Sequence, residues 1–164
     1  GIVSRHDSHG NGAGLRASLM DVLQSQGKVI SAGKWRNNSP VLKDEYDDDL
    51  RRFLGDCRYN ICIENTNSAG YVTEKVFQAF LAGSIPIYWG GGSYFEPEVL
   101  TGNGVIRMIG KDVNEVAREV ACLEGDSAYR EDWLNRPILT PWAVEWIEER
   151  LFKLKQQLEI LLKK

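Results

Sequence analysis

Short runs rich in apolar and β-branched residues alternate along the chain with longer segments whose apolar residues recur every three or four positions. The short runs predict strands at residues 1–4, 28–33, 58–64, 84–89 and 105–110. Two longer segments, 15–27 and 72–83, have the period of amphipathic helices and end at glycine. This alternation predicts a doubly wound, Rossmann-like α/β fold: a parallel sheet of five or six strands with helices on both faces.

The end of the chain has a different pattern. Between 141 and 164, apolar residues recur in steps of four and three positions, at Ile147, Leu151, Leu154, Leu158 and Leu161. This spacing predicts a long amphipathic helix that packs on a domain formed by residues 1–140. Two alternatives also fit the pattern, namely a helix that lies on a membrane surface and a helix that pairs with another copy.

An acidic run at 44–53, "DEYDDDLRRF", precedes the third predicted strand. Asp47 and Asp48 stand four residues before Arg51 and Arg52, which is the spacing of ion pairs on a helix surface. We therefore expect a solvated helix there. A metal-binding Asp-x-Asp is the less favoured alternative, because no buried strand leads into the run.

Composition narrows the function classes. With 164 residues, 43% of them apolar, and a net charge of -3, the chain has the size and composition of one globular domain. Its basic residues are dispersed and balanced by acids, so nucleic-acid binding is not expected. Cys57, Cys62 and Cys122 form no C-x-x-C pair and have no histidine nearby, so no metal site is expected.

No window reaches eighteen apolar residues and no signal-peptide layout opens the chain. The first residues, "GIVSRH", resemble the middle of a strand, which predicts an upstream segment.

Candidate chemistry gathers where predicted strands turn into helices, the edge at which parallel sheets bind ligands. A helix beginning near Thr73 would direct unpaired N–H groups and a partial positive charge out of this edge. Lys75, in its first turn, opposes the helix dipole and is explained if it meets a phosphate. The alternatives are a lysine that extends into solvent and an ion pair with Glu64.

A second candidate anion site lies in "SHGNGAGLRASL". Gly10, Gly12 and Gly14 allow a tight turn, and Arg16 in the first turn of the next helix has a guanidinium suited to phosphate. Two such junctions would place Arg16 and Lys75 at one edge of one sheet. Together they predict a diphosphate site.

Other polar residues follow the same strands. Glu64 and Asn65 could hydrogen-bond to ribose or sugar hydroxyls, and Tyr71 could stack on a ring or offer its hydroxyl. Taken alone, each is better explained as an ordinary loop residue. The stretch "YWGGGSYFEPE" adds a glycine-rich turn to this edge.

The stretch "NICIENTNSAGYVTEKVFQAFLAGSIPIYWG" resembles the signature of the α1,3-fucosyltransferase family. Further likeness is found in "GAGLRASLMDVL", "SAGKWRNN" and "RYNICIENT", and it covers roughly residues 2 to 95. The chain departs from the family pattern at Arg5, where asparagine is usual, and at Ile63, where phenylalanine is common.

The resemblance implies the carboxyl-terminal, GDP-β-L-fucose-binding half of a two-domain GT-B type glycosyltransferase, acting by inverting transfer to a glycan hydroxyl such as that of N-acetylglucosamine. By the same resemblance, Arg16 and Lys75 are expected to neutralise the diphosphate. Asn65, Tyr71 and Glu74 contact the nucleoside, ribose or fucose.

The general base would belong to an amino-terminal acceptor domain, so no catalytic residue is assigned here and this chain alone should turn over poorly. No tightly bound cofactor and no divalent metal are expected. The alternatives are a non-catalytic GDP-sugar-binding module and, less favoured, transfer of another sugar. The location would be the bacterial cytoplasm or membrane periphery, or the Golgi lumen in a eukaryote.

Overall fold

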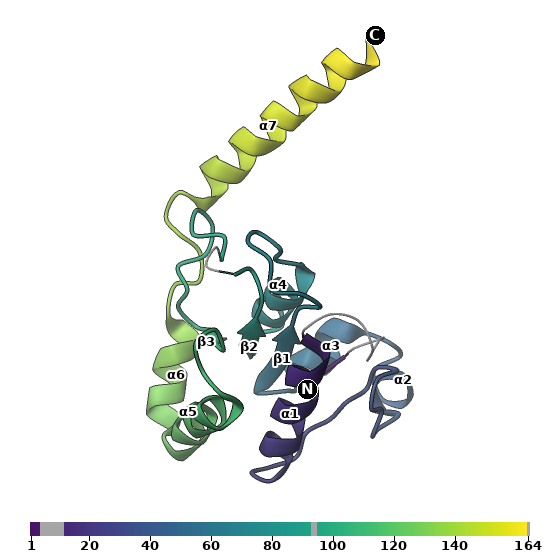
Figure 1. The fold of residues 1–164 in the computed structure, drawn as a ribbon, viewed down its shortest axis with the longest axis vertical. Coiled ribbons are helices and arrows are strands. Elements are labelled where there is room, and N and C mark those ends of the chain that lie inside the picture. Colours follow the sequence, from purple (N-terminus) through teal and green to yellow (C-terminus); the bar gives the residue numbers. More distant parts are fainter. Residues whose placement is uncertain (4–11, 93–94, 164) are drawn as a thin grey trace.

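The computed structural model describes residues 1–3, 12–92 and 95–163. At its centre is a parallel three-stranded sheet in the order β1-β2-β3 (Figure 1). The strands are β1 (Tyr59–Ile63), β2 (Ile85–Trp89) and β3 (Ile106–Arg107). They coincide with the third, fourth and fifth runs predicted from the sequence, and their parallel pairing confirms the predicted α/β class.

The first two predicted strands are reduced to one parallel bridge beside β1. Ile2 pairs with Ser31, and Gly1 hydrogen-bonds to the backbone of β1, its amino group lying 2.6 Å from the Tyr59 carbonyl oxygen. The second segment bends away because the Asn38 side chain accepts from the Ser31 N–H at 2.8 Å and the Ser31 hydroxyl donates to the Trp35 carbonyl. The described sheet therefore has fewer strands than the five or six predicted.

Helices cover both faces of the sheet, as the alternating pattern predicts. On one face, α1 (Gly12–Gln24) and α5 (Val113–Gly125) contact each other and the strands. On the other, α4 (Glu74–Leu81) packs on β1 and β2, with α3 (Leu50–Gly55) beside it. Alternation along the strands divides the core accordingly, with Ile61 and Ile63 facing α1 while Cys62 and Tyr88 face α4.

Three helices were not anticipated from the pattern: α2 (Val41–Asp44), α5 and α6 (Ser127–Asn135). The solvated helix expected at 44–53 is only partly correct. Asp47 and Asp48 have positive φ angles and precede α3, so the predicted ion pairs with Arg51 and Arg52 at helical spacing do not form. Asp49 instead caps α3 by accepting from the Arg52 N–H at 3.1 Å.

The carboxyl-terminal helix is present as α7 (Ala143–Leu162), but the prediction that it packs on the domain is wrong beyond its first turn. Ala143 is buried and Trp146 is partly buried against the α4 side of the core. The rest of α7 extends away from the molecule to the carboxyl terminus (Figure 1). Among the described residues, no helix has both the length and the apolar composition needed to cross a membrane.

Candidate functional site

A fully buried carboxylate lies at the carboxyl end of β1. Glu64 is 0% exposed, and its Oε1 accepts from both the backbone N–H and the hydroxyl of Thr73, each at 2.8 Å. Its Oε2 accepts from the Lys75 ammonium, which also lies 3.1 Å from the Thr73 hydroxyl. A buried carboxylate needs such partners, because desolvation otherwise disfavours its charge. Loop 65–73 thus folds back so that the start of α4 contacts the end of β1.

Glycine permits the close approach of the backbone to Glu64. A Cβ on Gly12, the first described residue of α1, would overlap the Glu64 carbonyl oxygen. A Cβ on Gly90, which follows β2 with φ of +146°, would overlap the Glu64 side chain. Two of the predicted glycine-rich segments therefore enclose one buried acid. Gly10 of the first segment lies outside the described residues.

Lys75 has a structural partner in Glu64, which was one of the alternatives left open by the sequence. Thr73 occupies the N-cap position of α4, but its hydroxyl donates to Glu64 rather than capping the helix. The anion at this helix start is consequently the Glu64 carboxylate. Lys75 therefore has a structural role at this end of α4, because it neutralises a buried charge.

Arg16 is buried on the other side of Glu64. Because α1 already includes Gly12 and Gly14, Arg16 lies in the second turn rather than in the predicted first turn. Only 3% of it is exposed, its Nη2 donates to the Ile63 carbonyl at 3.2 Å, and its guanidinium lies 5.5 Å from the Trp35 ring centre. Burial lowers the pKa of Arg16 and the nearby Glu64 charge opposes that shift.

Arg16 and Lys75 therefore lie at the same edge of the sheet, as the two strand-to-helix junctions predicted. Glu64 couples them, since it is ion-paired with Lys75 and interacts electrostatically with Arg16. Arg16 is fully buried and Lys75 is partly buried, so water screens their interactions with Glu64 only weakly.

The other predicted donor contacts differ in accessibility. The residues Asn65, Tyr71 and Glu74 are exposed in loop 65–73 and the first turn of α4. The glycine-rich turn after β2 reaches this loop, because the Asn67 side chain accepts from the Gly92 N–H at 2.7 Å. Glu64 does not share this exposure, so its direct contact with a sugar hydroxyl does not fit the geometry.

Arg107, at the end of β3, is a further cation on the α4 side that sequence analysis missed. It pairs in register with Tyr88 of β2, its guanidinium lies 4.6 Å from the Phe95 ring centre, and its buried Nε has no hydrogen-bond partner among the described residues. The signal in the sequence was a single arginine within the apolar run "VIRMIG".

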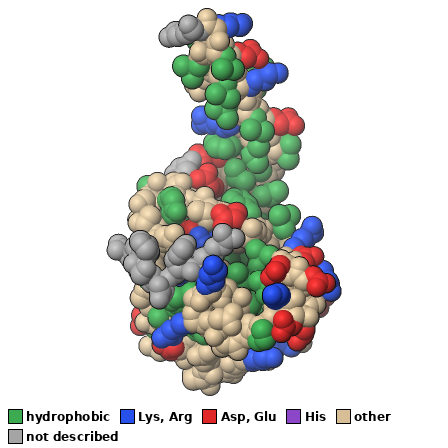
Figure 2. Space-filling view, turned by 90° about the vertical axis from the view of Figure 1, so that its right-hand side faces the viewer, with side chains coloured by type: hydrophobic (Ala, Val, Ile, Leu, Met, Phe, Trp, Pro, Cys, Tyr) green, Lys and Arg blue, Asp and Glu red, His purple; other side chains and the backbone are tan. Residues whose placement is uncertain are grey.

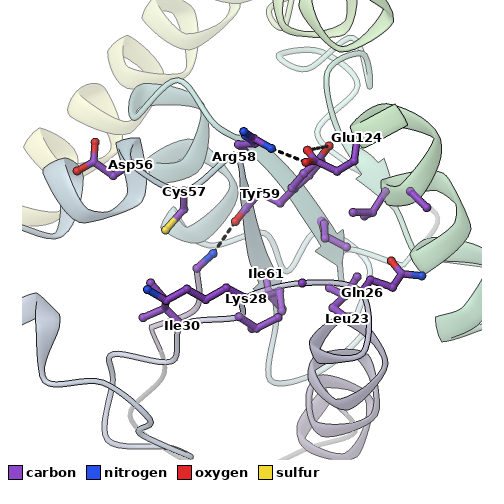
Figure 3. Close-up of a pocket in the computed structure, with 16 residues that line it drawn as sticks. Leu23, Gln26, Lys28, Ile30, Asp56, Cys57, Arg58, Tyr59, Ile61 and Glu124 are labelled. Atoms are coloured by element: carbon purple, nitrogen blue, oxygen red, sulfur yellow. Dashed lines mark hydrogen bonds and ion pairs between the residues drawn. The ribbon is translucent and has the colours of Figure 1, made fainter. Parts of the chain in front are cut away.

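A large cavity lies at the opposite edge of the sheet. Its volume is about 810 Å³, and it is lined by the amino end of β1, the end of α1 and α5. Figure 3 shows the residues that line it. Arg58 and Glu124 form an ion pair in it, and the Tyr59 hydroxyl donates to Glu124 at 3.0 Å. None of the predicted site residues lines it, and ligands of parallel sheets bind at the carboxyl ends of strands. We therefore place the candidate site around Glu64.

Metal ligands are not grouped in the described parts of the chain, where no three His, Cys, Asp or Glu side chains could hold one ion.

Comparison with known proteins gives a consistent family likeness. Residues 2–137 match the family model described as glycosyltransferase family 10 (fucosyltransferase), C-terminal. The chain is 38% identical over 82 residues to the α-(1,3)-fucosyltransferase FucT of Helicobacter pylori, an alignment that covers 49% of this chain and 16% of that protein. It is 28% identical over 111 residues to a putative fucosyltransferase-like protein of Arabidopsis thaliana, covering 68% of this chain and 21% of that one.

Solved structures match over a longer stretch. A crystal structure of α1,3-fucosyltransferase with GDP-fucose aligns with a TM-score of 0.67 and 27% identity, covering 82% of this chain and 37% of that one. The same enzyme class crystallised with GDP aligns with a TM-score of 0.66 at 26% identity. The chain thus spans little more than a third of the solved chains it matches.

Proposed function

Since the chain belongs to the glycosyltransferase family 10 (fucosyltransferase) C-terminal family, we propose that it is the donor-binding domain of an inverting fucosyltransferase. Its substrates would be GDP-β-L-fucose and a glycan hydroxyl, such as that of N-acetylglucosamine, giving an α1,3 linkage. The observation that carries the proposal is the placement of two cations at the carboxyl end of β1, where Arg16 donates to the Ile63 carbonyl and Lys75 is ion-paired with Glu64.

In the proposed complex, the diphosphate of the donor binds beside Glu64. Lys75 is 27% exposed on its side chain, so its ammonium can turn from Glu64 toward a phosphate while the Thr73 N–H and hydroxyl continue to hold the carboxylate. Arg16 contributes positive charge from the opposite side. Charge placed there stabilises GDP as it leaves the fucose carbon with the bonding electrons.

The exposed residues of the adjoining loop would recognise the rest of the donor. Asn65 and Glu74 offer hydrogen-bonding groups, and Tyr71 offers a ring face and a hydroxyl. Because Glu64 is buried, we assign it a positioning role toward Lys75 and Thr73. With cations available for the diphosphate, the proposed binding requires no divalent metal.

Transfer also requires a base that deprotonates the acceptor hydroxyl. We place this base in an amino-terminal acceptor domain, because this chain spans only 37% of the solved fucosyltransferase chain. The second candidate function is therefore a GDP-sugar-binding module that does not catalyse transfer by itself.

Calorimetry with GDP-fucose, GDP and GMP tests donor binding. We expect GDP-fucose and GDP to bind and to raise the melting temperature by mass action, and GMP to bind about tenfold more weakly or worse. Lys75→Gln and Arg16→Lys should each weaken GDP binding, whereas Arg58→Gln, which removes a cation at the opposite edge, should not. Equal affinity for GMP and GDP would refute the diphosphate site.

A transfer assay separates the enzyme from the binding module. Fucose transfer from GDP-fucose to an acceptor ending in N-acetylglucosamine is measured with this chain alone and with the acceptor domain of a related fucosyltransferase joined before it. We expect little turnover from the chain alone and a marked gain in the joined protein. Donor binding without transfer in a folded joined protein would favour the module.

A further inference from the structure

Helix α7 carries an unpartnered apolar stripe. Ile147, Leu151, Leu154, Leu158 and Leu161 all lie on the part of α7 that extends away from the domain, and each is exposed. Figure 2 shows hydrophobic side chains following this projecting helix. A contiguous apolar strip of this length is unfavourable in water and usually marks a surface that is covered by a partner.

The spacing of the stripe is that of a coiled coil. Steps of four, three, four and three place Leu151 and Leu158 at a positions, and Ile147, Leu154 and Leu161 at d positions, of a heptad. The a and d positions are the ones at which two helices interlock their side chains. The partner that this repeat fits is therefore another helix with the same repeat.

We propose that α7 pairs with α7 of a second copy of this chain as an antiparallel coiled coil. In the register that sets Leu151 beside Leu154 of the second copy, Ala143 lies near Leu162 of that copy. The projecting stretches of the two helices then lie side by side, with Ile147 beside Leu158 of the second copy. Their globular domains lie at opposite ends of the pair, which suits a helix that projects away from its own domain (Figure 1).

Charges beside the stripe select the orientation. In the antiparallel register, Glu148 faces Lys155 of the second copy, and the two-fold axis repeats this pair of opposite charges. In a parallel pair, Arg150 at a g position would face Lys155 of the second copy at an e position, which are like charges. Complementary flanking charges are the feature by which coiled coils set the direction of pairing.

The same charges argue against a membrane surface as the partner. Helices that lie on anionic membranes concentrate lysine and arginine on their polar face. In contrast, α7 mixes four acidic with three basic residues, namely Glu145, Glu148, Glu149, Glu159, Arg150, Lys153 and Lys155. A helical protein partner fits this balanced set better.

Sedimentation equilibrium of the full chain tests the pairing. We expect concentration-dependent dimers. Leu151→Gln and Leu158→Gln should each raise the dimer dissociation constant by at least about tenfold, because the two-fold axis buries each changed side chain twice. Phe152→Gln is the matched control: Phe152 is 60% exposed and Leu151 is 59% exposed, but Phe152 lies off the stripe. It should leave dimerisation nearly unchanged.

Charge reversal tests the direction. Lys155→Glu should weaken an antiparallel dimer by opposing it to Glu148, and the double variant Glu148→Lys with Lys155→Glu should restore pairing. A parallel dimer would instead be strengthened by Lys155→Glu, which removes its contact with Arg150.

Three results would overturn the proposal. These are a wild-type chain that stays monomeric at all concentrations, equal effects of the stripe and control variants, and a Lys155→Glu dimer tighter than wild type. Vesicles containing phosphatidylserine provide the competing partner. Binding of a monomeric chain to such vesicles, lost in Leu158→Gln, would assign the stripe to a membrane.

Discussion

Lys75 and Glu64 form an ion pair in which the carboxylate is completely buried and the lysine side chain is 27% exposed. This difference in exposure decides what each residue contributes. Glu64 can exist as a charged group in the interior only with its partners, whereas Lys75 retains access to solvent and to a ligand. The pair thus connects the stability of the β1–α4 junction with the proposed binding of a diphosphate.

We predict that Lys75→Gln lowers the free energy of unfolding by about 2 kcal/mol, since it leaves a buried carboxylate without its cation, offset in part by the access of water to this position. Urea titration measures the change. In a double-mutant cycle, Lys75→Gln should cost much less when it is made in a chain that already carries Glu64→Gln. Lys153→Gln, which removes a surface ion pair with Glu149 in α7, serves as the control and should cost less than about 0.5 kcal/mol. Full additivity in the cycle would contradict the pairing.

The two described glycines of α1 should respond in opposite directions to alanine. Gly12→Ala introduces a Cβ that overlaps the Glu64 carbonyl oxygen, so we expect a loss of about 1–3 kcal/mol in unfolding free energy. The Cβ of Gly14→Ala meets no atom within 4 Å, so the higher helix propensity of alanine should stabilise the domain by about 0.5–1 kcal/mol. Thermal unfolding of both variants provides the measurement. Equal effects would show that α1 does not closely approach the end of β1.

Arg107 provides a third test, because its buried Nε has no hydrogen-bond partner among the described residues. Arg107→Met keeps an unbranched side chain against Phe95 while removing a desolvated donor. We expect the unfolding free energy to change by less than about 1 kcal/mol, or to increase. A loss of about 3 kcal/mol or more in urea titration would indicate that Arg107 neutralises a charge essential to the fold.

Local patterns predicted the layers of the fold because strands and helices bury their faces with different periods. They located β1, β2, β3, α1 and α4, and they placed Glu64 at the carboxyl end of its strand. The alternation of side chains along β1 also determines that Cys62 and Glu64 face α4.

Contacts that depend on how a loop folds back were not predictable from local patterns. The ion pair of Lys75 with Glu64 requires loop 65–73 to bring α4 to β1, and the alternatives for Lys75 could not be separated without it. Burial of Arg16 depends likewise on Trp35 from another segment. For α7, periodicity revealed an apolar face, but periodicity carries no information on whether the domain or another molecule covers that face.

The last prediction concerns Cys62, whose thiol is buried behind α4. Burial, reinforced by the nearby Glu64 charge, raises the pKa of Cys62 from 9.0 to about 12. In the folded state, the thiol stays protonated where an unfolded chain would lose its proton. The contribution to stability is therefore fully present below about pH 9 and is lost as pH rises toward about 12, by up to about 1.4 kcal/mol per pH unit.

Urea unfolding at pH 8 and above, with a reductant present, should show a steeper loss of unfolding free energy with pH for the wild-type chain than for Cys62→Ala. The comparison cancels the titration of other groups, and the pH-independent cost of the smaller side chain does not affect the slope. Cys122→Ala is the control, because Cys122 is exposed and its removal should leave the slope unchanged. Parallel slopes for wild type and Cys62→Ala would show that burial does not hold the Cys62 thiol in its neutral form.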